Sequence, residues 1–329
     1  MLTREGPPSD ASAWRAVVRV LRSTARGALH FVSDSLSAVL FPSDCRVCGL
    51  PLARFSLLPI CESCWNDLPV QSAPLCLRCG EALSFEAPGP DEKYAQCRPC
   101  RVTPPDFENA VAHGVYRGTL RSLLHLLKYS GLEPIAPRLG AHLADRILAM
   151  PGLPQNLVVV PVPLYRRKRR ERGFNQAERL ARAAITVVRR RRPTLHVQLE
   201  AGLLERQRAT ESQAGLTPHQ RRANVRGAFS VPRPEEVQGR DVLIIDDIYT
   251  TGATARACAT ALKRAGAAHV WVATVARAQK EFATAAEAEP AEARVQTELP
   301  MEEDFVYWDH GVSGGRADHD GRPGTNART

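Results

Sequence analysis

Short apolar runs and longer amphipathic stretches follow one another between residues 109 and 280. Runs of consecutive apolar residues, such as "VLII" at 242–245, indicate strands buried on both faces, whereas apolar positions spaced three or four apart indicate helices. The pattern predicts strands at 110–116, 156–163, 241–247 and 269–277 and helices at 119–129, 136–150, 174–190 and 252–266. This alternation is typical of the α/β class, in which a mainly parallel sheet carries helices on both faces.

The residues on either side of this region have a different pattern. Within residues 1–40, the stretch 12–40 has roughly helical apolar periodicity. It predicts an amphipathic helix that packs on its own protein, with a membrane-surface or partner helix as the alternative. Arg19 and Asp34 are among the charges that interrupt it, so we expect no signal peptide, no membrane span and a cytoplasmic location. Residues 281–329 are rich in Ala, Glu, Pro and Gly and predict a disordered tail.

The overall charge favours an anionic partner. The 329 residues include 44 Lys and Arg against 35 Asp and Glu, which gives a formal net charge of +9 and a pI near 9.3. A charge of this sign attracts nucleic acid or phosphates, although it carries no information about the fold.

Eight of the nine cysteines form four C-x-x-C pairs within residues 41–101. In chain order they make two sets, first Cys45, Cys48, Cys61 and Cys64 and then Cys76, Cys79, Cys97 and Cys100. Thiolate-only sets suit structural zinc with no open position for catalysis, so we predict two Zn²⁺ ions in a separate small double zinc-ribbon module. A cross-braced pairing of the sets and disulfide bonds are the alternatives. Metal removal is expected to unfold this module and to spare the sheet domain. The ninth, Cys258, is expected to pack in the core.

A Thr- and Gly-rich turn, "YTTGAT" at 249–254, follows one predicted strand and opens the next predicted helix. Such a turn leaves backbone N–H groups pointing outward at the positive end of the helix dipole, where a phosphate binds. Thr250, Thr251 and Thr254 add hydroxyl donors, and Gly252 lets the backbone approach an anion closely. The turn therefore indicates a phosphate-binding loop.

Two adjacent carboxylates, Asp246 and Asp247, stand immediately before this loop at the carboxyl end of the strand. Ligands bind at that edge of an open parallel sheet. Acids would serve a phosphate poorly, but they accept hydrogen bonds from neighbouring hydroxyl groups. A 5-phosphorylated ribose satisfies both features, with its phosphate in the loop and its 2- and 3-hydroxyls on the acids.

The stretch "VLIIDDIYTTGAT" resembles the phosphoribosyl pyrophosphate (PRPP) motif of type I phosphoribosyltransferases. The stretches "LLHLLKYSG" (123–131), "VVVPVPLYRRKRRERGFNQAERLA" (158–181) and "LERQRATESQAGLTPHQRRANVRGAF" (204–229), with the cysteine module, resemble the ComF family of competence-associated, phosphoribosyltransferase-like proteins. The resemblance implies a type I phosphoribosyltransferase-like parallel sheet with helices on both faces over 109–280, preceded by the double zinc ribbon at 41–101.

The resemblance also implies which residues hold the ligand. PRPP would be bound by Asp246, Asp247, Thr250, Thr251, Gly252, Ala253 and Thr254. The candidates for the pyrophosphate side, and for a mobile hood over 204–229, are Arg166, Arg172, Asn175, Arg206, Gln213 and Arg222. A solvated helix face is the alternative for the basic run at 166–172. Mg²⁺ is expected to accompany PRPP, because the pyrophosphate needs neutralising.

For function, the ComF resemblance implies DNA uptake and processing during natural transformation, with single-stranded DNA and competence-machinery protein as partners. The alternatives are a metabolic phosphoribosyltransferase that joins a base or amine to PRPP, and a non-catalytic, PRPP-regulated DNA-binding or assembly protein. A complete glutamine amidophosphoribosyltransferase is not expected, since the chain begins "MLTREG" and lacks the cysteine nucleophile and glutaminase domain of that class. The sequence identifies no catalytic residue, which leaves enzyme activity as one of the alternatives.

Overall fold

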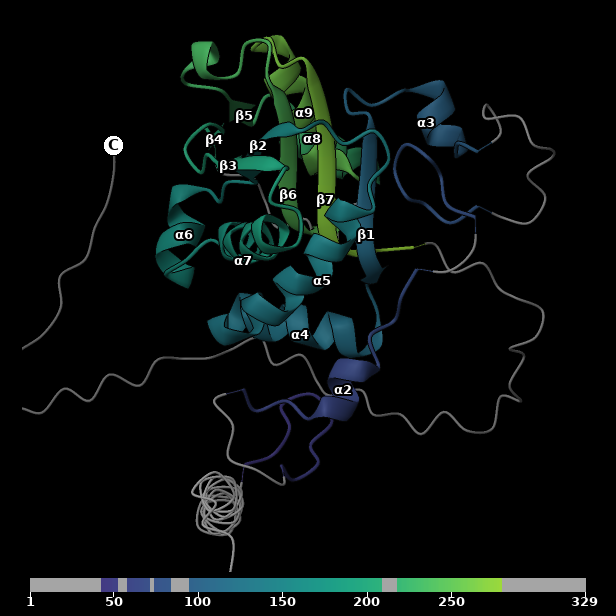
Figure 1. Cartoon of the computed structure of the whole chain (residues 1–329), viewed down its shortest axis with the longest axis vertical. Helices are drawn as coiled ribbons and strands as arrows, with labels where there is room; N and C mark the ends of the chain where they lie inside the picture. The colour runs from purple at the N-terminus through teal and green to yellow at the C-terminus, as the bar shows by residue number, and fades with distance from the viewer. Residues whose placement is uncertain (1–42, 53–57, 72–73, 84–94, 209–217, 280–329) are drawn as a thin grey trace, which may run out of the picture. The chain divides into compact units, whose positions relative to one another are not determined.

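The computed structural model describes residues 43–52, 58–71, 74–83, 95–208 and 218–279 (Figure 1). The helix expected at 12–40 and the tail expected at 281–329 both lie outside the described residues. Among the described helices, none combines the length and the apolar character needed to traverse a bilayer.

Five parallel strands form the central sheet in the order β1-β7-β6-β2-β3. They are β1 (Asn109–Val115), β2 (Asn156–Pro161), β3 (His196–Leu199), β6 (Asp241–Tyr249) and β7 (His269–Arg277). The four strands expected from the apolar pattern are confirmed. The edge strand β3 is additional, because only one of its four residues is fully buried and its polar–apolar alternation, His-Val-Gln-Leu, is too short to be distinctive.

Helices connect and cover these strands: α4 (Gly118–Tyr129), α5 (Ala136–Leu148), α6 (Arg166–Arg172), α7 (Gln176–Arg191), α8 (Pro218–Val225) and α9 (Ala253–Arg264). Two short 3₁₀ turns are η2 (Glu133–Ile135) and η3 (Pro234–Glu236). The two-residue strands β4 (Glu205–Arg206) and β5 (Phe229–Ser230) pair antiparallel at the two ends of the segment expected to form a hood.

The sheet separates two hydrophobic cores, as the alternation along β6 shows. Leu243 and Ile245 pack in a core with residues of α4, α5 and α7, whereas Val242 and Ile244 pack in a core with residues of α9. Because successive side chains of a strand point to opposite faces, a strand with apolar residues at every position must be covered on both sides. The expected α/β class with helices on both faces is confirmed.

The cysteine-rich segment packs into both cores. It contains the short helices α2 (Glu62–Asn66) and α3 (Arg98–Val102). Trp65 of the first half is buried in the core that contains α4 and α5, and Cys76, Cys79 and Cys100 of the second half are buried in the core that contains α9. The cysteine segment and the sheet fall within one compact unit of the chain. This contact changes the expectation that metal removal spares the sheet, since the cores lose part of their lining if either half unfolds.

Candidate functional site

A pocket of about 350 Å³ opens at the carboxyl ends of β2 and β6. Its lining includes these residues expected from the sequence: Asp246, Asp247, Thr250, Gly252, Ala253, Thr254, Arg172 and Arg206. The fold therefore brings the acidic pair, most of the loop and two of the candidate cations to one cavity. Arg166, Thr251 and Asn175 do not line it.

The acidic pair is positioned by the end of β6, where Asp246 is partly buried and Asp247 is 4% exposed. One carboxylate oxygen of Asp246 accepts a hydrogen bond from the backbone N–H of Asp247 at 2.9 Å. Burial raises the pKa of Asp246 to about 8, and the negative charge of Asp247 adds to the rise. Near neutral pH the pair therefore retains a proton that two exposed aspartates would have released.

Lys128, at the end of α4, was not expected in the site. Its Nζ lies 3.0 Å from Oδ2 of Asp247, and the two side chains are 16% and 6% exposed. Burial, the largest cause, lowers the pKa of Lys128, but the contributions of Asp247 and Asp246 raise it, and the net shift is upward. A lysine at this position is detectable in the sequence in retrospect, because it stands four residues after buried Leu124 on the apolar face of the helix.

The loop after β6 bends sharply into α9. Gly252 has φ +74° at the position before the helix, and a Cβ there would overlap the phenol of Tyr249. Both the left-handed backbone and the close approach require glycine. The hydroxyl of Thr251 accepts a hydrogen bond from the backbone N–H of Ala253 at 3.4 Å. The N-terminus of α9 thus faces the pocket, which suits an anion.

Cations also line the pocket. Arg172 lies with its guanidinium 5.2 Å from the ring centroid of Tyr129, and Arg206 lies 5.5 Å from that of Phe229. Lys168 also lines the pocket, and partial burial, reinforced by the charge of Arg172, lowers its pKa. The cavity can therefore hold a ligand that carries both negative charge and hydroxyl donors.

Other candidates take different positions. Asn175 is buried and structural, since its side chain donates to the carbonyl of Val162 at 3.0 Å and caps α7 by accepting from Ala177 N–H at 3.1 Å. Arg166 is exposed on the first turn of α6. Gln213 lies outside the described residues, and so does the side chain of Arg222 in α8.

Gln176, the first residue of α7, belongs to the stretch "RGFNQ" (172–176), whose pair of amides at a helix entry suits a polar ligand, and it lines the pocket. It is 5% exposed, and its Oε1 has no hydrogen-bond partner among the described residues. A buried amide oxygen without a donor is costly in a folded protein, so its position in the pocket favours a ligand hydrogen bond.

The cysteines form the two sets expected in chain order. Within each set the four Sγ atoms lie within 4.8 Å of one another, which confirms the sequential grouping over the cross-braced one. All nine cysteines are described and are free thiols. Backbone N–H groups point at sulfur in both sets, from Cys61 to Cys45 at 3.3 Å and from Cys97 to Cys76 at 3.2 Å. Four convergent sulfurs with such donors fit a tetrahedral zinc ion.

These features define a class: a phosphoribosyltransferase-type domain joined to a pair of four-cysteine ribbons. A model described as "Double zinc ribbon domain" matches residues 36–101, and one described as "Phosphoribosyl transferase domain" matches residues 174–298. DNA utilization protein YhgH of Escherichia coli (strain K12) is 32% identical over 234 residues, which cover 70% of this chain and 95% of that protein.

Two competence proteins are also similar. Competence protein F of Haemophilus influenzae is 29% identical over 227 residues, covering 67% of this chain and 90% of that protein. Competence protein ComFC of Bacillus subtilis is 25% identical over 226 residues, covering 66% and 84%. The chain belongs to the family of YhgH and these competence proteins, the ComF family.

Proposed function

We propose that this protein binds PRPP together with Mg²⁺ in the pocket at the end of β6, and that it acts on single-stranded DNA during DNA uptake or utilisation. The observation that carries the PRPP assignment is the convergence of the acidic pair, the glycine loop and the N-terminus of α9 on one cavity. The phosphate would lie in the loop from Thr250 to Thr254, and the ribose hydroxyls on Asp246 and Asp247. Arg172 and Arg206 would face the pyrophosphate.

Lys128 bears on where Mg²⁺ binds. Because Lys128 already neutralises Asp247 at 3.0 Å, the acidic pair offers a cation little uncompensated charge. We place Mg²⁺ on the pyrophosphate of the ligand, where it supplies neutralising charge, and the acids on the ribose. Each four-cysteine set would hold one structural Zn²⁺, in a module spanning 41–101 ahead of a ligand-binding domain spanning 109–280.

Calorimetric titration of the full chain with PRPP and Mg²⁺ tests the PRPP assignment. The double variant Asp246→Asn, Asp247→Asn should weaken binding, because the pair shares one negative charge near neutral pH and a hydrogen bond to a charged acceptor contributes about 1.5 to 3 kcal/mol. Gln198→Ala, on the edge strand β3 and outside the pocket lining, is the control. Equal PRPP affinity in the wild type and the double variant would place the ligand elsewhere.

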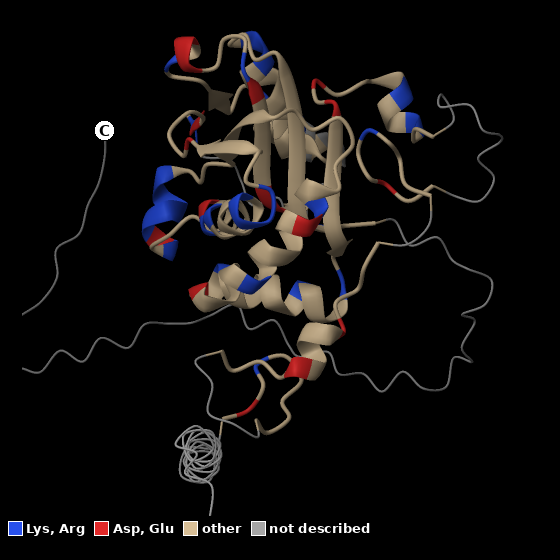
Figure 2. Cartoon of the chain, in the orientation of Figure 1, with Lys and Arg blue, Asp and Glu red and all other residues tan. Residues whose placement is uncertain are grey.

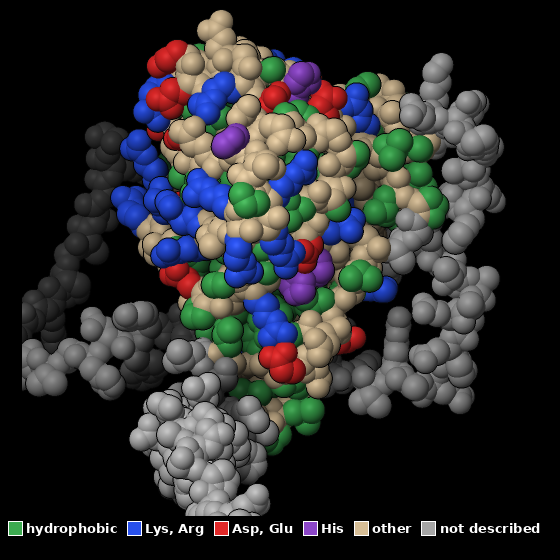
Figure 3. All heavy atoms as spheres, in the orientation of Figure 1, with side chains coloured by type: hydrophobic (Ala, Val, Ile, Leu, Met, Phe, Trp, Pro, Cys, Tyr) green, Lys and Arg blue, Asp and Glu red, His purple; other side chains and the backbone are tan. Residues whose placement is uncertain are grey.

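DNA binding is assigned to the basic face that α6 and α7 form (Figures 2 and 3). The names of the YhgH and competence relatives and the net charge of +9 support this assignment. Exposed arginines of α6 are suited to phosphates, whereas Lys168 of the same helix lines the pocket. The face and the pocket can therefore be altered separately.

The test is the triple variant Arg166→Gln, Arg169→Gln, Arg170→Gln, with binding of single-stranded DNA measured between about 50 and 200 mM salt. Each lost phosphate contact lowers the salt slope by about 0.7, so the slope should fall by up to about 2. PRPP affinity should stay unchanged. If the wild type binds no DNA at about 50 mM salt, where nonspecific binding is easily detected, the DNA role is wrong. Turnover of PRPP with a free base or amine would then favour a metabolic phosphoribosyltransferase.

A further inference from the structure

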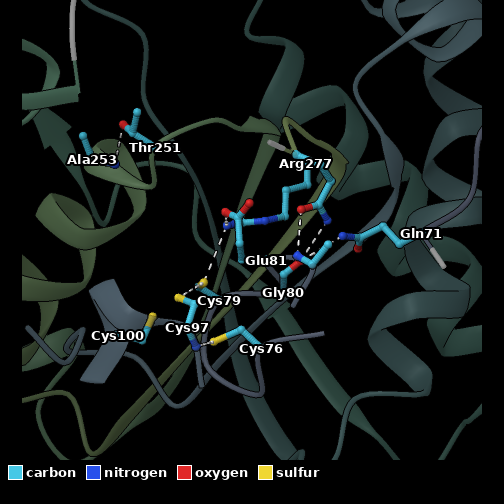
Figure 4. Close-up of polar contacts among 12 residues, drawn as sticks. Gln71, Cys76, Cys79, Gly80, Glu81, Cys97, Cys100, Thr251, Ala253 and Arg277 are labelled. Atoms are coloured by element: carbon cyan, nitrogen blue, oxygen red, sulfur yellow. Dashed lines mark hydrogen bonds and ion pairs between the residues drawn. The ribbon is translucent and has the colours of Figure 1, made fainter. Parts of the chain in front are cut away.

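The second cysteine set is tied to the end of β7 by a buried arginine. Arg277 is the last residue of β7 and is 3% exposed. Its Nη2 lies 3.5 Å from Sγ of Cys79 and donates to the carboxylate of Glu81 at 2.6 Å (Figure 4). Its Nε and Nη1 have no hydrogen-bond partner among the described residues. The contacts that neutralise the charge of Arg277 are therefore with Cys79 and Glu81 of the second cysteine segment.

Arg277 also contacts the residue that supports the phosphate loop. Its guanidinium carbon lies 4.2 Å from the ring centroid of Tyr249, and the two residues are opposite each other in the β6–β7 pair. The same ring packs so closely under Gly252 that no side chain fits between them. A movement of Arg277 would therefore displace Tyr249 and, through it, the turn at Gly252.

A second arginine joins the cysteine set to the helix that begins at the loop. Arg256 lies in the first turn of α9, and its backbone N–H donates to the carbonyl of Gly252 at 2.9 Å. Its Nη2 lies 3.8 Å from Sγ of Cys100, and its Nη1 donates to the carbonyl of Thr103 at 2.8 Å. Two separate paths thus run from the sulfurs to the loop.

The charges of these groups depend on whether metal is bound. Four thiolates around one divalent cation carry a net charge of −2, which two guanidinium groups balance. Without metal, no ion holds the four sulfurs together, so the contacts of Arg277 with Cys79 and of Arg256 with Cys100 are no longer fixed. Arg277 would then keep the carboxylate of Glu81 as its anionic contact, and Arg256 would keep the carbonyl of Thr103. Buried charge that loses its partner is strongly destabilising, so this region would rearrange.

In the described part of the chain, the first cysteine half contacts α4 and α5, not the phosphate loop. It is linked to α5 by Arg138, whose guanidinium lies 4.5 Å from the Trp65 ring centroid and pairs with Glu62 at 2.6 Å. Neither Arg138 nor Glu62 lines the pocket. The two sets are chemically alike and differ in what they contact, which provides an internal control.

We propose that Arg277 and Arg256 are positioning residues that couple metal binding at the second cysteine set to the shape of the phosphate loop. With metal bound at this set, the loop has its ligand-binding conformation, and ligand in the pocket in turn retains the metal. The coupling deepens the proposed function and depends on it only for the identity of the ligand as PRPP. Because coupling between two binding sites is reciprocal, either direction can be measured.

The first experiment follows zinc release from the full chain to a chromogenic chelator, with native mass spectrometry reporting the number of ions that remain. Saturating PRPP and Mg²⁺ should slow release from the second set by about tenfold, within the usual range of coupling, and leave the first set unchanged. Arg277→Met and Arg256→Met should each reduce this protection, Arg277→Lys should restore part of it, and Arg138→Met should leave it intact. Equal protection in all variants, or none in a wild type that binds PRPP, would overturn the coupling.

A second experiment needs no ligand. Hydrogen exchange of the amides from Thr251 to Arg256 is compared between Cys97→Ser, which removes a ligand of the second set, and Cys48→Ser, which removes one of the first. Exchange should accelerate in Cys97→Ser and stay near the wild-type rate in Cys48→Ser. Equal rates in both variants would refute the coupling. A wild type that fails to bind PRPP but shows this exchange pattern would refute the PRPP assignment and leave the coupling standing.

Discussion

Replacing Lys128 by methionine tests the centre of the site, because it removes a buried charge at nearly constant volume. Its Nζ lies 3.0 Å from Oδ2 of Asp247, and neither side chain is more than one-fifth exposed. With an effective dielectric constant of about 20, Coulomb's law gives roughly 332/(20 × 3.0), or about 5.5 kcal/mol, for this pair. Breaking a buried ion pair by removing one partner typically costs about 3 to 5 kcal/mol, because the other charge stays buried.

Proton uptake sets an upper limit on this loss. A carboxyl with an ordinary pKa of about 3.9 takes up a proton at pH 7 at a cost of about 1.36 kcal/mol per pH unit, or about 4 kcal/mol. We therefore expect Lys128→Met to lower the free energy of unfolding by about 3 to 4 kcal/mol at pH 7.

Thermal and urea unfolding of the full chain measure this effect. For a domain of this size each kcal/mol shifts Tm by about 2 to 4 °C, so Lys128→Met should lose about 6 to 16 °C at pH 7. The double variant Lys128→Met, Asp247→Asn should recover most of the loss, because no charge stays unpaired. Arg167→Met breaks an exposed pair with Glu171 and should cost less than about 1 kcal/mol. A loss equally small in Lys128→Met, or the absence of recovery in the double variant, would refute this account of the site.

Two further predictions concern pH and metal. The pKa of Asp246 is raised in the folded protein from 3.8 to about 8, so the folded state holds this proton more tightly than the unfolded state. The stability that the proton contributes is therefore fully present below about pH 4 and is lost as the pH rises to about 8. Asp246→Asn should therefore gain stability relative to the wild type as pH is raised over that window, and denaturation curves that stay parallel across it would contradict the raised pKa. Elemental analysis of reduced protein should find two zinc ions per chain, as two four-sulfur sets predict. Chelation should lower the Tm of the sheet as well as unfolding the ribbons, and an unchanged sheet transition would show that the shared cores contribute little.

Local features of the sequence are sufficient to predict the main helices and strands and part of the candidate site. The four consecutive apolar residues at 242–245 must be covered on both faces of the sheet, and this identifies β6 as a central strand. The role of Gly252 is predictable because a tight turn into a helix needs a left-handed backbone that glycine adopts readily. The sequential cysteine sets follow from short spacing, because residues close in sequence need little chain entropy to converge on one metal. The edge strand β3 lies at the limit of such reasoning, since pairing with β2 rather than its own pattern makes it a strand.

Which residues pair across long distances in the sequence is set by the tertiary structure alone. In the sheet, β1 and β6 lie on either side of β7, and α4 follows β1 in the chain. Lys128 reaches Asp247 because α4 packs in the same core as Leu243 and Ile245 of β6. Arg277 reaches Cys79, 198 residues earlier, because the second ribbon packs against the core on the opposite face. The spacing of Lys128 from Leu124 marks an unusual lysine on the apolar face of α4 but does not identify its partner, and the Arg277–Cys79 contact leaves no local spacing in the sequence. The sequence by itself determined which functional groups stand at the end of β6. The packing of the ribbons and helices around the sheet determined which charges neutralise those groups, because ion pairs between distant residues form only after the cores have brought the backbones together.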